Sequence, residues 1–167
     1  MEPNFPKDLH VMVNKFAFFF RKPVRGEVIM LDSPVDPSKG LIKRVIAVEG
    51  ETLEIREKKV YIDGKKLDEP YTYFSHPETI YIGDNIPPVQ VPEGTLFVMG
   101  DNRDNSADSR DWGFLDIEKV KGRAFIIYWS WDGSMPKWGW LGGVPLPDPR
   151  AILLHGIRWR RIGKLLP

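Results

Sequence analysis

The sequence contains no cysteine among its 167 residues, which excludes disulfide bonds, thiolate nucleophiles and cysteine-based metal sites. It also lacks any apolar run close to the roughly 20 residues that a membrane-spanning helix needs; the apolar run at 16–20 is "FAFFF". Neither sign of charge is in excess, because 24 Lys and Arg residues oppose 23 Asp and Glu residues, and we therefore expect no nucleic-acid partner. The three histidines have no metal-ligand spacing, so we expect neither a metal site nor a cofactor.

Proline and glycine, fifteen of each, divide the chain into short segments with little helical periodicity. Apolar and β-branched runs separated by turn sequences predict strands at 27–31, 41–48, 52–57, 59–64, 95–100 and 123–131. One helical turn is predicted over 116–120, where Asp116 is placed to cap it. The pattern predicts a mostly β protein with an antiparallel, barrel-like core.

The segment 66–92 differs from the rest because it carries five prolines and few core-type runs. We interpret it as an excursion from the main sheet, either a small inserted β subdomain or a long ordered loop. The main β core would then consist of residues 1–65 and 93–167. Within that core, a charged turn at Glu57 and Lys58 is predicted to join two strands.

The strand predicted at 41–48 contains two adjacent cations, Lys43 and Arg44, among apolar neighbours. Side chains alternate along a strand, so the odd-numbered residues 41–47 are expected on one face and the even-numbered residues 42–48 on the other. A lysine on an edge strand would keep its ammonium group in water. A partly desolvated lysine would instead have a lowered pKa and could act as a general base, as in serine–lysine pairs. The strand alone leaves both interpretations open.

A second motif, MGDNRDNSADSRDWGF at 99–114, concentrates aspartate, asparagine, serine and arginine in one polar loop. Such side chains bond to nearby backbone amides, and aspartate–arginine pairs at 101 and 103 or at 108 and 110 would brace the loop. A calcium loop fails, because leucine, serine and arginine occupy positions where it needs glutamate, glycine and a ligand. The open interpretations are a solvated turn and a rigid scaffold that presents the hydroxyl of Ser106 or Ser109.

The order of these motifs resembles the bacterial type I signal peptidases, which are membrane-anchored serine endopeptidases that remove signal peptides from exported proteins. The match covers most of the chain, and the polar loop is its most specific part. The segments that carry it are RGEVIML (25–31), IKRVIAVEGE (42–51), VYIDGK with the following L and EPY (60–71), GDNRDNSADSRDWGF (100–114), GRAFIIYW (122–129) and RWRRIGKL (158–165).

This resemblance implies roles for individual residues. Lys43 matches the general base, and Ser106 matches the hydroxyl that hydrogen-bonds to the lysine and orients it. Asp108 and Arg110 match a structural ion pair beneath the site.

The resemblance also implies how substrate binds and where the nucleophile lies. Leu41 and Ile42 match the strand to which an extended peptide adds, and small residues, usually alanine, are selected at P1 and P3. The family's nucleophile lies in a Ser-Met-x-Pro motif. Residues 1–3 match Met-x-Pro, which puts Met1 in the substrate-binding set and places the catalytic serine directly before it, outside this sequence.

Three interpretations of the chain follow from that departure. The native protein is longer and carries the serine and a membrane anchor, or the chain is a catalytically inactive relative that binds peptides. A self-cleaving repressor-type protease also uses a serine–lysine pair, but the 100–114 loop and the lack of a DNA-binding segment argue against it.

The implied partners are the signal peptides of preproteins and a membrane surface. The implied location is the cytoplasmic membrane, with this domain on the extracytoplasmic side. Tryptophans at 129, 131, 138 and 140 and phenylalanines at 16 and 18–20 either pack in the core or form an interfacial surface. The basic tail from residue 150 is either a solvated face or a contact for anionic lipid.

Overall fold

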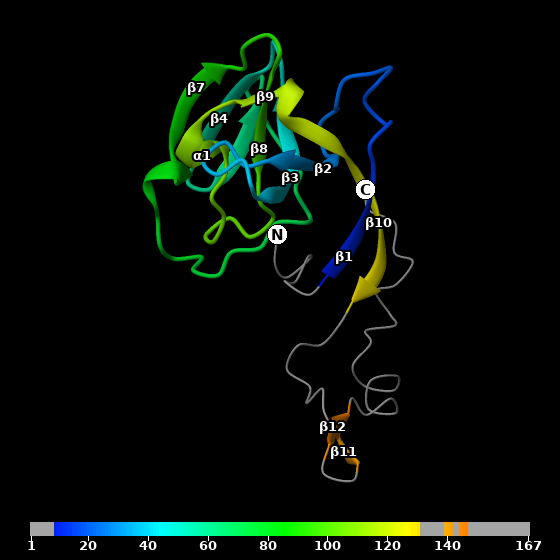
Figure 1. The fold of residues 1–167 in the computed structure, drawn as a ribbon. Coiled ribbons are helices and arrows are strands. Elements are labelled where there is room, and N and C mark those ends of the chain that lie inside the picture. The colour runs from blue at the N-terminus through cyan, green and yellow to red at the C-terminus, as the bar shows by residue number, and fades with distance from the viewer. Residues whose placement is uncertain (1–8, 131–138, 142–143, 147–167) are drawn as a thin grey trace.

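The computed structural model describes residues 9–130, 139–141 and 144–146, and its strands pair almost entirely in antiparallel fashion (Figure 1). The larger sheet consists, in spatial order, of β1 (Leu9–Asn14), β10 (Val120–Ser130), β2 (Val28–Asp32), β3 (Gly40–Val48), β8 (Thr95–Met99) and β9 (Leu115–Asp116). The second sheet consists of β6 (Lys65–Lys66), β5 (Lys59–Ile62), β4 (Thr52–Arg56) and β7 (Ile86–Gln90). A two-stranded sheet pairs β11 (Gly139–Leu141) with β12 (Val144–Leu146). The prediction of a mostly β, antiparallel fold is confirmed.

Two apolar clusters lie on either side of the central strands β3 and β8. One contains Ile29, Leu31, Val45, Leu96, Val98 and Leu115. The other contains Ile46, Ala47, Leu53, Ile55, Val60, Ile62, Val91, Phe97 and Met99, and joins the larger sheet to the second one. A register shift between Val45 and Ala47 interrupts the alternation of β3. Ala47 therefore packs with Ile46 instead of Val45, so the expected division of faces holds only up to this bulge.

The second sheet is built from tight turns. Asp63 and Gly64, both with positive φ, connect β5 to β6, and this residue pair is a favoured choice for a two-residue hairpin. Strand β7 carries Pro87 and Pro88 and was not predicted as a strand. It lies at the edge of its sheet, where missing backbone donors are tolerated.

Residues 67–85 cross from β6 to β7 and contact the polar loop. Tyr73 forms a parallel bridge with Asn102. Its backbone N–H donates to the Asp101 carbonyl at 2.8 Å, and its carbonyl accepts from the backbone N–H of Arg103 at 2.9 Å. The crossing ends in a 3-10 turn over Ile82–Asp84. The second sheet thus contains residues from both sides of the proposed 65/66 boundary, and the inserted unit over 66–92 stays a prediction.

Two of the short helical elements are capped by aspartate. Helix α1 (Ser109–Trp112), which was not predicted, begins after Asp108, whose carboxylate accepts from the backbone N–H of Arg110. A 3-10 turn over Ile117–Lys119 begins after Asp116, whose carboxylate accepts from the backbone N–H of Glu118. The second element confirms the helical turn predicted over 116–120.

Candidate active site

Lys43 lies on β3, which has β2 beside it along residues 40–44 and β8 beside it only from Arg44 onwards. Its side chain is only 6% exposed, and its ammonium nitrogen lies 2.6 Å from the hydroxyl oxygen of Ser106. The alternative of a lysine whose ammonium group lies in water is therefore wrong. Two motifs that are 63 residues apart in the sequence meet at this hydrogen bond.

Burial lowers the pKa of Lys43 below its ordinary value, because the charged ammonium loses its hydration. The carboxylates of Asp108 and Asp111 oppose this shift, and the guanidinium of Arg110 adds to it. The lowered pKa makes the neutral amine, which has a lone pair that can accept a proton, easier to form than in an exposed lysine.

Ser106 is half-buried and connects Lys43 to Asp108. Its oxygen accepts from Lys43, and its hydroxyl is hydrogen-bonded to the Asp108 carboxylate. A Cβ added at Gly100 would lie 2.2 Å from the Ser106 hydroxyl oxygen, so this hydroxyl fits only against glycine. The other candidate hydroxyl, that of Ser109, accepts from the backbone N–H of Val98 at 3.0 Å and is not presented to Lys43.

Asp108 is fully buried and organises the loop around the serine. Its carboxylate accepts from the backbone N–H of Gly100 at 3.0 Å and from the Arg110 guanidinium at 2.9 and 3.0 Å. Burial raises the pKa of Asp108, but the hydrogen bonds from Arg110, Gly100 and Ser106 outweigh it and hold the pKa below its ordinary value. Asp108 is therefore an anion at neutral pH, and the predicted Asp108–Arg110 ion pair is present.

Arg44, on the opposite face of β3 from Lys43, forms a second buried ion pair that was not predicted. Its guanidinium donates to both carboxylate oxygens of Asp101 at 3.0 Å and lies 4.0 Å from the centre of the Tyr71 ring. Arg103 binds Glu69 from the crossing segment. The sequence signal for the Arg44 pair was a second cation next to Lys43 in an apolar strand, because a buried charge requires a partner.

The N-terminal half of β3 has an open side. Leu41 and Ile42 pair with β2, but the register with β8 begins only at Arg44, opposite Met99. Among the described strands, residues 40–43 thus have a neighbour on the β2 side alone. Met1, the third predicted substrate-binding residue, lies outside the described residues.

The described residues contain no group of three or more His, Asp or Glu side chains placed to hold a metal ion. In the same part of the chain, no helix has the length and apolarity needed to cross a bilayer. The tryptophan side chains at 129, 131, 138 and 140 and the basic tail lie outside the described part of the structure.

Comparison with known proteins connects this geometry to a family. A sequence model described as "Signal peptidase, peptidase S26" matches residues 1–129. The chain is 35% identical to "Probable signal peptidase I-1" of Synechocystis, with coverage of 92% of this chain and 76% of the relative. It is 32% identical to the signal peptidase I of Aquifex aeolicus, with coverage of 99% and 86%.

The chain belongs to the peptidase S26 family of signal peptidases. A crystal structure of a signal peptidase I from Enterococcus faecalis is similar in fold as well, with a TM-score of 0.51 and 35% identity. That match covers 62% of this chain and 97% of the other. In this signal peptidase family member, Lys43 and Ser106 are brought together, Asp108 and Arg110 support them, and Leu41 and Ile42 precede the lysine on the same strand.

Proposed function

We propose that this protein is a serine endopeptidase that removes N-terminal signal peptides from exported proteins, with Lys43 as its general base. The observation that carries the proposal is the buried hydrogen bond of 2.6 Å between the Lys43 nitrogen and the Ser106 hydroxyl oxygen. Membership in the signal peptidase family supports the reaction class.

In the proposed mechanism, the neutral amine of Lys43 accepts the hydroxyl proton of a serine supplied directly before Met1. The serine oxygen attacks the scissile carbonyl, and the leaving amine takes a proton from the Lys43 ammonium as the acyl-enzyme forms. Lys43 then deprotonates the water that hydrolyses the acyl-enzyme. Ser106 keeps the lysine nitrogen oriented throughout. No cofactor takes part in these steps.

The open side of β3 is the proposed substrate site. An extended signal peptide would add as a strand beside Leu41 and Ile42, so that its scissile bond passes Lys43. Strand addition presents alternate side chains to the protein, which accounts for selection at P1 and P3. Small residues in an Ala-x-Ala pattern are the proposed specificity.

An exposed phenylalanine loop supports a membrane surface as the second partner. Phe16, Phe19 and Phe20 have 71%, 68% and 97% of their surface exposed, whereas Phe18 packs against the core. Aromatic side chains of this kind are suited to the interfacial region of a bilayer. We place the domain on the extracytoplasmic side of the cytoplasmic membrane, with preprotein signal peptides as substrates and no nucleic-acid partner.

The test compares two forms of the full chain, one extended by serine and one by alanine directly before Met1. Both are incubated with a peptide that contains Ala-x-Ala, and the products are mapped by mass spectrometry. The serine form is expected to cut after the second alanine and the alanine form is expected to leave the peptide intact. Equal cleavage by both forms would contradict the proposal, and peptide binding without cleavage by either form would support the inactive, peptide-binding alternative.

A further inference from the structure

Lys58 occupies a backbone position that lysine rarely adopts. It follows Glu57 in the turn between β4 and β5, and both residues have positive φ, 48° and 67°. The next hairpin of the same sheet uses Asp63 and Gly64, the usual kind of residue pair for such a turn. A lysine held at positive φ requires compensation from elsewhere in the structure.

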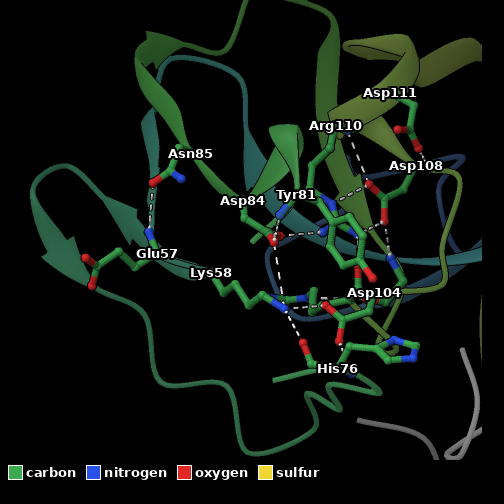
Figure 2. Close-up of polar contacts among 12 residues, drawn as sticks. Glu57, Lys58, His76, Tyr81, Asp84, Asn85, Asp104, Asp108, Arg110 and Asp111 are labelled. Carbon is green, nitrogen blue, oxygen red and sulfur yellow. Dashed lines mark hydrogen bonds and ion pairs between the residues drawn. The ribbon is translucent and has the colours of Figure 1, made fainter. Parts of the chain in front are cut away.

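That compensation comes from the side chain of Lys58, which is buried although charged side chains are usually exposed. Lys58 is 8% exposed, and its nitrogen lies above the ring of Phe74 at 5.3 Å. The ring of Tyr81 lies 5.4 Å from the same nitrogen (Figure 2). The ammonium donates to a carboxylate oxygen of Asp104 at 2.7 Å and to the backbone carbonyl of His76 at 2.9 Å. These are charge-assisted hydrogen bonds in a desolvated setting, where geometry is tightly defined.

Asp104 belongs to the polar loop and precedes Ser106 by two residues. Its side chain is fully buried, and its second oxygen accepts from the backbone N–H of His76 at 2.7 Å. One oxygen is thus bound by Lys58 from the turn between β4 and β5, and the other by the backbone of His76 in the crossing segment. These contacts of Asp104 hold the polar loop in place next to Ser106, whose hydroxyl binds Lys43.

A second carboxylate links the same ammonium to the other side of the serine. Asp84 lies 3.8 Å from the Lys58 nitrogen and 3.5 Å from the guanidinium of Arg110 (Figure 2). Arg110 in turn binds Asp108, which is hydrogen-bonded to the serine hydroxyl. Lys58 therefore contacts carboxylates that lead to Ser106 from both directions along the chain.

We infer that Lys58 is a positioning residue for the Lys43–Ser106 pair, acting through Asp104 and Asp84. This rests on the proposed function, which gives that pair its role. Without the ammonium, two buried carboxylates lose a cation and must be rehydrated or moved. The loop then shifts, the serine hydroxyl leaves the lysine nitrogen, and Lys43 gains access to water.

The experiment compares Lys58→Met, which keeps the apolar stem and removes the charge, with Lys59→Met, which removes an exposed charge one residue away. The pKa of Lys43 is followed by NMR of its side-chain carbon in folded, isotope-labelled full-length protein. The Lys58 variant is expected to raise the pKa of Lys43 towards that of exposed lysines, and the Lys59 variant is expected to leave it unchanged. Lys58→Arg, which restores a cation, is expected to recover part of the shift.

Activity gives the second measurement, in the serine-extended form. Misplacement of a catalytic pair by a fraction of an ångström to an ångström predicts a loss of about ten- to a hundredfold in kcat, with KM nearly unchanged. If the parent form cuts no peptide, the proposed function fails, but the NMR titration still tests whether Lys58 positions Lys43.

An unchanged pKa of Lys43 in folded Lys58→Met protein would overturn the inference, even if the protein were less stable. Should that variant fail to fold, Asp104→Asn removes the same ion pair with little change of shape, and the same two results decide the question. The charges that act directly on Lys43, those of Asp108, Arg110 and Asp111, are identical in all these variants.

Discussion

Two buried lysines, Lys43 and Lys58, show how the surroundings of one residue type decide its use. Both are less than a tenth exposed. The ammonium of Lys58 lies against the Asp104 carboxylate, a backbone carbonyl and two aromatic rings. The nitrogen of Lys43 is hydrogen-bonded to the neutral hydroxyl of Ser106, and Asp108, the carboxylate that acts most strongly on it, is bound to Arg110.

The difference teaches that burial alone does not make a lysine a base. A buried lysine with carboxylate partners is suited to hold two segments together. A buried lysine whose nearby carboxylate is neutralised by arginine has a lowered pKa and is suited to exchange protons. The polar loop at 100–114 lies between the two lysines in this network and contributes a side chain to each of them, Ser106 and Asp104.

The largest effect is expected from removing Lys43, the proposed general base. Lys43→Ala and Lys43→Arg in the serine-extended form should each lower kcat by about a thousandfold or more, because neither side chain can accept a proton at neutral pH. The rate of Ala-x-Ala peptide cleavage measures this. Retained activity in either variant would show that another group is the base.

Removing the neighbouring cation, Arg44, should instead lower the stability of the fold. Arg44→Met removes the guanidinium that binds both oxygens of buried Asp101, and loss of one partner of such a pair destabilises proteins by about 3–5 kcal/mol. Urea unfolding at equilibrium gives the free energy of unfolding for comparison with the parent chain. A change below about 1 kcal/mol, at the level of surface pairs, would contradict the account of β3.

A smaller effect on kcat is expected from crowding the Ser106 hydroxyl. In Gly100→Ala the new methyl group would lie 2.2 Å from the Ser106 oxygen and 3.7 Å from the Lys43 nitrogen, so the serine must move. We expect kcat to fall by about a hundredfold, and Ser106→Ala to lower it by at least tenfold while the protein stays folded. Activity that is unchanged in both variants would remove Ser106 from the site.

The smallest effect concerns stability and its dependence on pH. The folded-state pKa of Lys43 is depressed, so the unfolded chain binds more protons between that pKa and about 10.4. Below its folded-state pKa, Lys43 therefore lowers the free energy of unfolding by the full amount. This penalty disappears as the pH rises from the folded-state pKa to about 10.4. Each unit of depression corresponds to about 1.4 kcal/mol.

Lys43→Met lacks this penalty and should be more stable than the parent chain at pH 7. The advantage should shrink as the pH approaches that of an exposed lysine. Thermal unfolding at several pH values measures it, with Lys59→Met as the control for loss of an exposed charge. An advantage that does not change with pH would mean that packing, and not the buried amine, is responsible.

The sequence was sufficient for the features that depend on local pattern. The apolar runs predicted the central strands, and the spacing in the polar loop predicted the Asp108–Arg110 pair. Asp116 predicted a capped turn. Each of these is decided by residues a few positions apart.

The features that escaped prediction depend on contacts between distant segments. The charged turn at Lys58 was predicted but the burial of its side chain was not, because its partner Asp104 is 46 residues away. Strand β7 was not predicted because it contains two prolines, which a strand tolerates only at the edge of a sheet. The face on which Ala47 lies was predicted wrongly because a bulge interrupts the alternation of β3. None of these is encoded in a short window of sequence.

The most direct test of the central claim is the pKa of Lys43 itself in the unmodified chain. NMR of the lysine side-chain carbons, with Lys43 assigned by its absence in Lys43→Arg, gives this value beside those of all other lysines. The account predicts that Lys43 titrates clearly below exposed lysines such as Lys59. If Lys43 titrated together with them, near about 10.4, it would be an ordinary cation at neutral pH and could not be the base.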